Sequence, residues 1–250
     1  MSIINTFDNE TPALINPNVL AAKKPGFPDT AIVCFGEHFI DALDELCGME
    51  MLDVMIACVN VPVYKFTYEE KVFAAYCSTL GGPATVQLME LMAEKGCKRF
   101  IFFGSCGVLD NNIPPLKLIL PTEAYRDEGT SYHYAPPSDY ITVKNAGRLD
   151  EIMTELEIPH VSGKTWTTDA LFRETAGNTA KRKADGCIAV DMECASVTAA
   201  ADFRGTQTYY ILYSADSLDS DEWDSRTLGK LRQENRTDFM RTLLEIAAKI

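Results

Sequence analysis

The stretch Val190-Asp191-Met192-Glu193-Cys194-Ala195-Ser196 places two acidic side chains where a short apolar segment gives way to small residues. Its pattern predicts a strand over 188–190 followed by a helix over 192–203 that packs closely on a sheet. A third acid, Asp216, follows Glu193 by 23 residues, at the end of another apolar segment. Ligands bind at the carboxyl ends of strands in α/β sheets, so these acids are candidates for substrate contact. The alternative is that Asp191 and Glu193 are acids at a helix N-terminus, where the helix dipole favours them.

Strand and helix patterns alternate along the rest of the chain. This alternation predicts an α/β fold in three layers, α/β/α, with a mixed central sheet. The segments 53–59 and 71–77 are expected to form an antiparallel pair, joined by a connection that contains Pro62. Residues 1–29, which contain four prolines, are expected to form an extended arm before a single domain over 30–250. The remaining strands are predicted over 30–35, 99–103, 117–120, 160–168 and 207–213, and the remaining helices over 39–46, 84–95, 142–156 and 226–249.

Composition excludes several classes of function. The formal net charge of −13 argues against a surface for nucleic acid or for anionic membranes, because such surfaces need clustered Lys and Arg. No apolar segment approaches the ~20 residues that span a bilayer, and no secretory leader is evident, so we expect a cytoplasmic protein. The three histidines are dispersed, and no metal site is expected. The eight cysteines show no metal-ligand spacing and are interpreted as buried free thiols: Cys34, Cys47, Cys58, Cys77, Cys97, Cys106, Cys187 and Cys194.

Two glycine-containing segments follow apolar strands. Gly36 stands between a predicted strand and a predicted helix, where backbone N–H groups can approach an anion. The tetrapeptide Gly104-Ser105-Cys106-Gly107 follows the apolar segment 99–103. It could present backbone N–H groups and one hydroxyl to an anion or a sugar hydroxyl. The alternative is a tight turn that only needs glycine for a positive φ.

Three of these elements, in this order, resemble the nucleoside phosphorylase and nucleosidase superfamily, which includes purine nucleoside phosphorylases and uridine phosphorylase. They are Gly104 to Gly107 after a buried strand, Val190 to Glu193 opening a helix, and Ser214-Ala215-Asp216. The resemblance covers the chain from about residue 31 to its C-terminus. The segment 78–83, Ser-Thr-Leu-Gly-Gly-Pro, and the loop 127–133 resemble the uridine phosphorylase side of the family.

The resemblance implies roles for the nucleoside half of a site. Glu193 would accept hydrogen bonds from the 2′ and 3′ hydroxyls of ribose, with Met192 packing under the sugar. Asp216 would be the general acid that protonates the leaving base. Base contacts would come from Phe172, Cys106 and Gly107. Uridine phosphorylases have no such acid and read uracil with a Gln/Arg pair that is not evident after Phe172, so a purine base is favoured.

For the phosphate half, the resemblance implies Gly36, Gly104 and Ser105, with Lys65 reaching the site of a partner subunit. The chain departs from the family here, because the two positions that usually hold phosphate-binding arginines are Ile40 and Phe102. Hydrolytic members have a water-activating glutamate at the position of Ile40; Glu37 or Asp41 could replace it. No histidine precedes His38, so the family's N-terminal histidine for the 5′-hydroxyl is absent as well.

The expected function is therefore cleavage of a nucleoside N-glycosidic bond by phosphorolysis, giving the free base and ribose 1-phosphate. Such an enzyme is a pentosyltransferase of purine salvage. It needs inorganic phosphate as co-substrate and no cofactor, and it is expected to be a homo-oligomer, a dimer or a trimer of dimers. Two alternatives stay open: a nucleosidase that uses water, and a non-catalytic protein that binds nucleosides.

Overall fold

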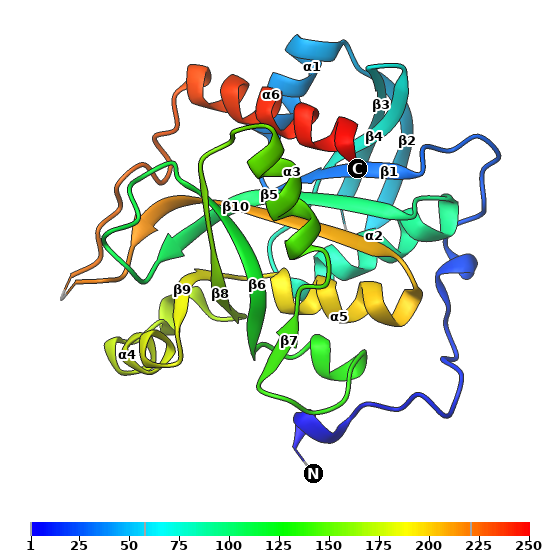
Figure 1. Ribbon diagram of the computed structural model, residues 1–250. Helices are drawn as coiled ribbons and strands as arrows, with labels where there is room; N and C mark the ends of the chain where they lie inside the picture. The colour runs from blue at the N-terminus through cyan, green and yellow to red at the C-terminus, as the bar shows by residue number, and fades with distance from the viewer. Residues whose placement is uncertain (1, 58, 221) are drawn as a thin grey trace.

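The structure is a computed structural model that describes residues 2–57, 59–220 and 222–250. It is a mixed ten-stranded sheet with helices on both faces, which confirms the expected α/β class (Figure 1). The strands are β1 (Thr30–Cys34), β2 (Glu50–Ala57), β3 (Val59–Tyr68), β4 (Lys71–Cys77), β5 (Arg99–Val108), β6 (Leu118–Asp127), β7 (Tyr140–Thr142), β8 (His160–Thr168), β9 (Cys187–Asp191) and β10 (Gln207–Ser217). The α-helices are α1 (Glu37–Cys47), α2 (Gly82–Lys95), α3 (Ala146–Glu155), α4 (Ala176–Ala184), α5 (Cys194–Arg204) and α6 (Gln233–Lys249).

The sheet is organised around β5, which pairs in parallel with both β1 and β10 and antiparallel with β9. Because β10 also pairs with β6, and β6 continues through β8 to β9, this part of the sheet closes on itself. The carboxyl ends of β5 and β10 therefore meet β9 in one small region. The acids predicted from the sequence at strand ends, Asp191 at the end of β9, Glu193 just after it and Asp216 in β10, lie in this region.

Helices α1, α3 and α6 pack on one face of the sheet, and α2 and α5 pack on the other (Figure 1). Alternate side chains of β5 supply both cores. Phe102 stacks on Tyr210 with ring centroids 5.5 Å apart on the α5 side. Phe103 lies 5.3 Å from Phe239 of α6 on the other side. A strand with apolar side chains on both faces is what the continuous run 99–103 predicted.

The predicted connection between 53–59 and 71–77 is wrong. The segment 62–68 is part of β3, which pairs antiparallel with β2 on one side and with β4 on the other. Pro62 pairs with Val54 of β2 and lies beyond the residues that β4 contacts, 64–68. A proline is tolerated in a strand where its missing N–H faces no partner, so here it does not mark a loop.

Other boundaries also differ from the predictions. Strands β5, β6 and β10 continue past their apolar segments, and neither α4 nor β7 was predicted. Helix α3 begins at Ala146 and α6 at Gln233, several residues later than their apolar spacing indicated. Gly229 has φ +70°, a conformation that ends regular helix and keeps the residues before α6 in a loop.

The segment before β1 contains two short 3-10 turns, Ile3–Asn5 and Pro17–Val19, and it follows the outside of the domain (Figure 1). Its apolar side chains are largely exposed, with Leu14 and Ile15 the most open. Contact of this arm with a neighbouring subunit stays a prediction.

The seven described cysteines are free thiols, and five of them are buried; Cys58 lies outside the described residues. Across residues 2–57, 59–220 and 222–250, no helix is long and apolar enough to cross a membrane. In that same part of the chain, no three His, Cys, Asp or Glu side chains are grouped as a metal site would require.

Candidate active site

Glu193 lies at the start of α5 with its side chain inside the protein, and only 5% of the residue is exposed. One carboxylate oxygen accepts a hydrogen bond of 2.7 Å from the backbone N–H of Gly81, which immediately precedes α2. Burial, with the charge of Asp191 as a second cause, raises the pKa of Glu193 to about 8. The backbone N–H of Met192 also donates to this carboxyl group and, like that of Gly81, opposes the rise.

Asp191 has a different role from Glu193, although the two acids are only two residues apart. Its carboxylate accepts hydrogen bonds from the backbone N–H groups of Glu193 (3.0 Å) and Cys194 (2.6 Å) and from the hydroxyls of Thr167 (2.8 Å) and Thr165 (3.2 Å). Asp191 therefore satisfies the first turn of α5 and joins it to β8. The helix-terminus alternative holds for Asp191 and leaves Glu193 as the acid available to a ligand.

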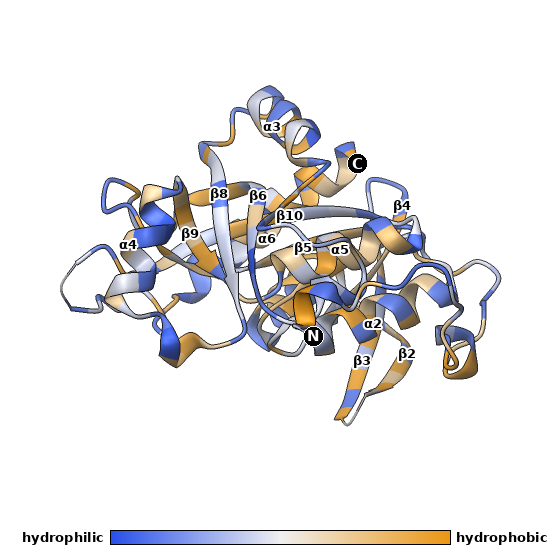
Figure 2. Ribbon diagram, turned by 90° about the horizontal axis from the view of Figure 1, so that it is seen from below, coloured by the Kyte–Doolittle hydropathy of each residue, from blue (hydrophilic) through white to orange (hydrophobic). Residues whose placement is uncertain are grey.

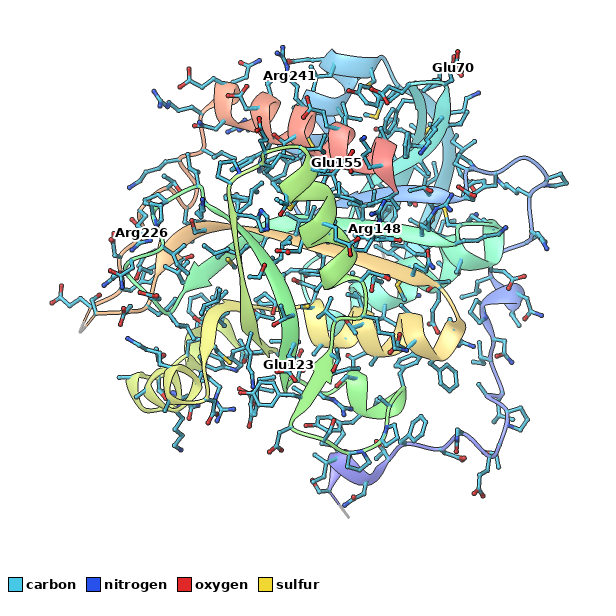
Figure 3. The ribbon with its side chains drawn as sticks, in the orientation of Figure 1. Glu70, Glu123, Arg148, Glu155, Arg226 and Arg241 are labelled. Carbon is cyan, nitrogen blue, oxygen red and sulfur yellow. The ribbon has the colours of Figure 1, made fainter. Side chains whose placement is uncertain are left out.

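Asp216 owes its position to an irregularity in β10. The register between β5 and β10 shifts between Ser214 and Asp216, and Asp216 then pairs with Gly107. A β-bulge of this kind re-aims a side chain. Burial raises the pKa of Asp216, while a 2.8 Å hydrogen bond from the Trp223 indole and the charge of Arg226 oppose the rise. Figure 3 shows Arg226 at the end of the molecule where β10 finishes.

Gly107 lies between the strand that leads to Glu193 and the strand that carries Asp216. On β5 it pairs with Val190 of β9 on one side and with Asp216 of β10 on the other. A Cβ at this position would lie 2.5 Å from Leu218 and 3.0 Å from Val190, so only glycine lets the strands approach. The stretch around Glu193 and the acid at Asp216 are thus held beside each other by one residue of the predicted site.

The tetrapeptide 104–107 is part of β5 and is not a turn, so the tight-turn interpretation was wrong, while its contact with an anion or a sugar hydroxyl stays a prediction. Gly104 and Gly107 do not have the positive φ that a tight turn would require. Space explains them: a Cβ on Gly104 would meet the Phe35 side chain at 2.7 Å. Apolar residues alone do not reveal where a strand ends when glycines continue it, and this is why the sequence pattern stopped at Phe103.

Asp216 faces a cavity of about 500 Å³, within the range of small-ligand sites. Phe172 and Leu171 come from the short helical turn after β8, and 94% of Phe172 is exposed at this cavity. Glu174, two residues further on, lines the same space. Burial, with the charge of Asp216 as a second cause, raises the pKa of Glu174 to about 7. The cavity thus combines an open aromatic ring with two carboxyl groups whose pKa values are raised by burial.

Two other residues predicted to contact the nucleoside, Met192 and Cys106, differ in how far they are buried. Met192 is half-buried between Asp191 and Glu193. Cys106 is buried, and its thiol is close enough to Asp191 and Asp216 for their charges to add to the effect of burial in raising its pKa. Its thiol contacts the Tyr213 carbonyl at 3.5 Å. Cys106 therefore contributes to the wall between the acids, and its contact with a base stays a prediction.

At the predicted phosphate half, Gly36 precedes α1 and the His38 ring packs against it, since a Cβ on Gly36 would lie 2.6 Å from His38 Cε1. Ser105 is half-buried on β5 and pairs with Tyr213 of β10. The two residues at the family's arginine positions face the cores. Ile40 points from α1 into the core between α1 and the sheet, and Phe102 is stacked between the rings of Phe35 and Tyr210. Neither side chain reaches a strand-end site.

Lys65 lies on β3, where its ammonium forms a 3.0 Å ion pair with Glu50 of β2, and 44% of its side chain is exposed. It borders a surface hollow with Phe66 and Gly48, apart from the cavity at Asp216. Within one chain Lys65 therefore does not join the other predicted residues. Its role across a subunit interface stays a prediction.

The loop that follows β6 has a structural role in the single chain. Glu128 is buried and accepts hydrogen bonds from the Ser196 hydroxyl of α5 (2.5 Å) and the Ser131 backbone N–H (2.9 Å). Arg126 is buried beside it, and its guanidinium donates to Ser131 and to the carbonyl of Pro136. The polar residues of 126–137 thus tie the loop to itself and to the helix that carries Glu193.

Three residues near the site were missed by sequence reasoning. Glu174 was noted only as part of a sequence that lacks the uracil-reading pair. Trp223 stands in a polar loop, and an isolated tryptophan in such a loop close to an acid was the available signal. Arg236 was included only as part of the predicted helix 226–249, and nothing in the sequence distinguishes it from the arginines around it.

The family of the chain follows from comparison with known proteins. The sequence model of the phosphorylase superfamily matches residues 31–250. A purine nucleoside phosphorylase, DeoD-type 2, of Aliivibrio fischeri is 24% identical over 218 residues, covering 86% of this chain and 87% of that protein. A DeoD-type purine nucleoside phosphorylase of Caldanaerobacter subterraneus is 27% identical over 194 residues, covering 74% and 81% of the two chains.

Solved structures show the same fold. Purine nucleoside phosphorylase from Toxoplasma gondii, in complex with immucillin-H, superposes with a TM-score of 0.77 at 20% identity and covers 89% of this chain and 91% of its own. Uridine phosphorylase from Vibrio fischeri also gives a TM-score of 0.77, at 19% identity over 96% and 100% of the two chains. With the family match over nearly the whole domain, the chain belongs to the phosphorylase superfamily.

Proposed function

We propose that the protein is a pentosyltransferase that cleaves the N-glycosidic bond of purine nucleosides with inorganic phosphate. The observation that carries this proposal is Asp216, a buried carboxyl group whose pKa is raised and which faces a cavity lined by an open aromatic ring. A raised pKa favours the protonated form of a carboxyl group, which is the form that can donate a proton to a departing base. No cofactor is required, because phosphate is the second substrate.

The reaction would divide between the two acids. Phosphate oxygen forms a bond to C1′ as the bond from C1′ to the base nitrogen breaks, and the electron pair of that bond moves onto the base. Asp216 gives its proton to the base nitrogen N7, which stabilises the leaving group. Glu193 holds the ribose through its hydroxyls, with the carboxyl group that lies at the start of α5. The products are the free purine and ribose 1-phosphate.

A purine is favoured over uracil by the chemistry of the cavity. N7 of a purine is an acceptor for the proton of Asp216, and uracil has no equivalent nitrogen beside its glycosidic bond. Glu174 adds a second carboxyl group that can pair with an N–H or a carbonyl group of the base. The names of the sequence relatives support the same preference.

Phosphorolysis is favoured over hydrolysis by the exposure of the acids that could activate water. Glu37 and Asp41 are both exposed on α1, and a general base needs to sit against the water that it deprotonates. Glu37 is also engaged with the Cys77 thiol. These acids therefore give little support to a water-activating site.

A homo-oligomer is part of the proposal. Strands β2 and β3 extend from the domain with apolar stretches along them (Figure 2). Ile56, Met51 and Val59 are exposed there, and a subunit contact would cover them.

The experiment is to incubate the protein with inosine, adenosine, guanosine and uridine, each with and without phosphate, while measuring free base and ribose 1-phosphate. We expect release of purine bases that requires phosphate and produces an equal amount of ribose 1-phosphate. Equal base release without phosphate would identify a nucleosidase. Binding of nucleosides without any release would identify a non-catalytic protein, and turnover of uridine alone would reverse the base assignment.

A further inference from the structure

A group of polar side chains lies at the carboxyl ends of β5 and β10, on the face covered by α1 and α6, and the acids Glu193 and Asp216 do not belong to it. It contains Arg236 from the first turns of α6, His38 from the first turn of α1, and Ser105 from β5. Figure 1 shows α6 beginning at the end of the sheet where β5 and β10 finish. Elements far apart in sequence therefore meet at this point.

Ring packing fixes the position of Arg236. Phe239, three residues further along α6, has its ring centroid 4.9 Å from that of Tyr213 and 5.3 Å from that of Phe103. Residues three apart lie on the same face of a helix, so Arg236 projects from the face that contacts the sheet. It lies one turn nearer the start of α6, and therefore beyond Phe103 toward the strand ends.

Ring packing also fixes His38 and Ser105 around the same tyrosine. The His38 ring is 4.3 Å from the ring of Phe39, which in turn makes an edge contact with Tyr213 at 5.9 Å. Ser105 pairs with Tyr213 in the sheet register, and it lies close enough to the Tyr213 hydroxyl to oppose the rise that burial causes in the pKa of that hydroxyl. The charge of Arg236 reaches both His38 and Tyr213.

Two nitrogens of this group lack partners. Arg236 Nε and His38 Nε2 are buried from solvent and make no hydrogen bond with any described residue. A guanidinium N–H can only donate, so the missing partner of Arg236 is an acceptor. Leaving such a donor buried and unsatisfied is costly, and such groups are rare in native structures.

The charges nearby favour an anion as that partner. His38 has its pKa lowered, first by burial and then by the charge of Arg236, while the exposed Asp41 opposes the shift. Glu234, in the first turn of α6, is paired with Arg232 and 62% of its side chain is exposed. The first turns of α1 and α6 both bring free backbone N–H groups and the positive end of a helix dipole to this end of the sheet.

We propose that Arg236, with His38 and Ser105, binds the phosphate co-substrate, so that the guanidinium for the anion comes from the C-terminal helix. This inference rests on the proposed function and names the residues that serve its phosphate half. Arg236 supplies a charged donor, and His38 and Ser105 supply neutral ones. The site needs no arginine at Ile40 or Phe102, whose side chains are buried in the cores.

The test compares Arg236→Ala and Arg236→Lys with Arg241→Ala, a control on the same helix whose side chain is exposed (Figure 3). Steady-state rates are measured against phosphate at saturating nucleoside and against nucleoside at saturating phosphate. Loss of a charge-assisted contact predicts a KM for phosphate about 10- to 100-fold higher in Arg236→Ala, with the KM for nucleoside changed little. Arg236→Lys should be intermediate, because an ammonium keeps the charge and loses the planar fork. Arg241→Ala should match the wild type.

An unchanged KM for phosphate in folded Arg236→Ala would overturn the inference, as would equal increases in both KM values. Calorimetric titration of each protein with inorganic phosphate alone gives a readout that does not depend on turnover. Binding by the wild type and its loss in Arg236→Ala supports the site even if the wild type proves to have no phosphorolytic activity, in which case only the proposed function fails. Equal binding by both proteins, or none by either, would overturn the site.

Discussion

The two halves of the candidate site are built in opposite ways. The nucleoside half uses acids that stand at strand ends and on the helix that follows, within 26 consecutive residues from Asp191 to Asp216. The phosphate half that we propose draws on side chains from α1, β5 and α6, elements that span most of the chain. In the first half burial raises the pKa of carboxyl groups, and in the second it leaves nitrogen donors without partners.

This difference indicates which residues of such a site can be replaced by residues from other elements. Glu193 and Asp216 depend on strand register and on a bulge, so they cannot be moved without rebuilding the sheet. A cation for phosphate needs only to reach the strand ends, and several elements pass there. The nucleoside half can therefore stay fixed while the phosphate half is supplied from another helix.

The largest effect should come from the general acid. Asp216→Asn keeps the shape of the side chain and removes its proton, so turnover of inosine should fall by about 10²- to 10⁴-fold with little change in nucleoside binding. The measurement is single-turnover base release together with the dissociation constant of the nucleoside. Asp224→Asn, an exposed acid in the adjacent loop, is the control. Turnover near that of the wild type would remove Asp216 from the mechanism.

A substitution at Asp191 distinguishes its structural role from the ligand-binding role that we propose for Glu193. Asp191→Ala would remove the acceptor of five hydrogen bonds, two from the start of α5 and three from hydroxyl groups of β8 and β10, and leave those donors buried. Unfolding should therefore cost about 3 kcal/mol less than in the wild type. Chemical denaturation measures the difference. A stability equal to that of the wild type would show that the start of α5 is held by other contacts.

Glu193 should matter for the sugar. Glu193→Ala removes the carboxyl group that accepts hydrogen bonds from the ribose hydroxyls, so kcat/KM should fall by about 10- to 100-fold on ribonucleosides. The 2′-deoxynucleoside should suffer a smaller loss, because it has already lost one of the two hydroxyls. Comparison of the two substrates on both proteins is the measurement. Equal losses on both would show that Glu193 does not read the 2′-hydroxyl.

The raised pKa of Glu193 also predicts a pH dependence of stability. The fold favours the protonated carboxyl, so this contribution to stability is complete below the ordinary pKa of glutamate and is lost as pH rises to about 8. Glu193→Gln stays neutral and should be more stable than the wild type by about 4 kcal/mol at pH 8, with the difference vanishing near pH 4.5. Thermal unfolding across this range checks it; parallel curves for the two proteins would contradict it.

Much of the architecture could be predicted because it depends on local patterns. The alternation of apolar segments with helical spacing was enough for the class of fold, and β1, α1, α2, β8 and α5 lie close to their predicted positions. Strands that continue through glycine or polar residues could not be followed, as at Gly104, since their pairing is decided by neighbours distant in sequence. Pro62 misled for the same reason, because only the strand arrangement shows that its missing N–H has no partner.

The sequence was informative for the nucleoside half of the candidate site, where recognisable motifs stand at the ends of predicted strands. Glu193 and Asp216 are recognisable because an acid after an apolar strand is unusual. Nothing in the sequence showed that the Asp191 carboxylate would accept hydrogen bonds from Thr165 and Thr167. Those bonds form because β8 and β9 are neighbours in the sheet. Arg236 could not be selected either, because a helix face is assigned only once the partner of Phe239 is known.

The most direct measurement is the rate of hypoxanthine release from inosine as a function of phosphate concentration, with ribose 1-phosphate quantified in the same samples. A two-part site with a nucleoside half and a phosphate half predicts a rate that is zero without phosphate and saturates as phosphate rises, with one ribose 1-phosphate formed for each base. Release at the same rate without phosphate, accompanied by free ribose, would contradict it.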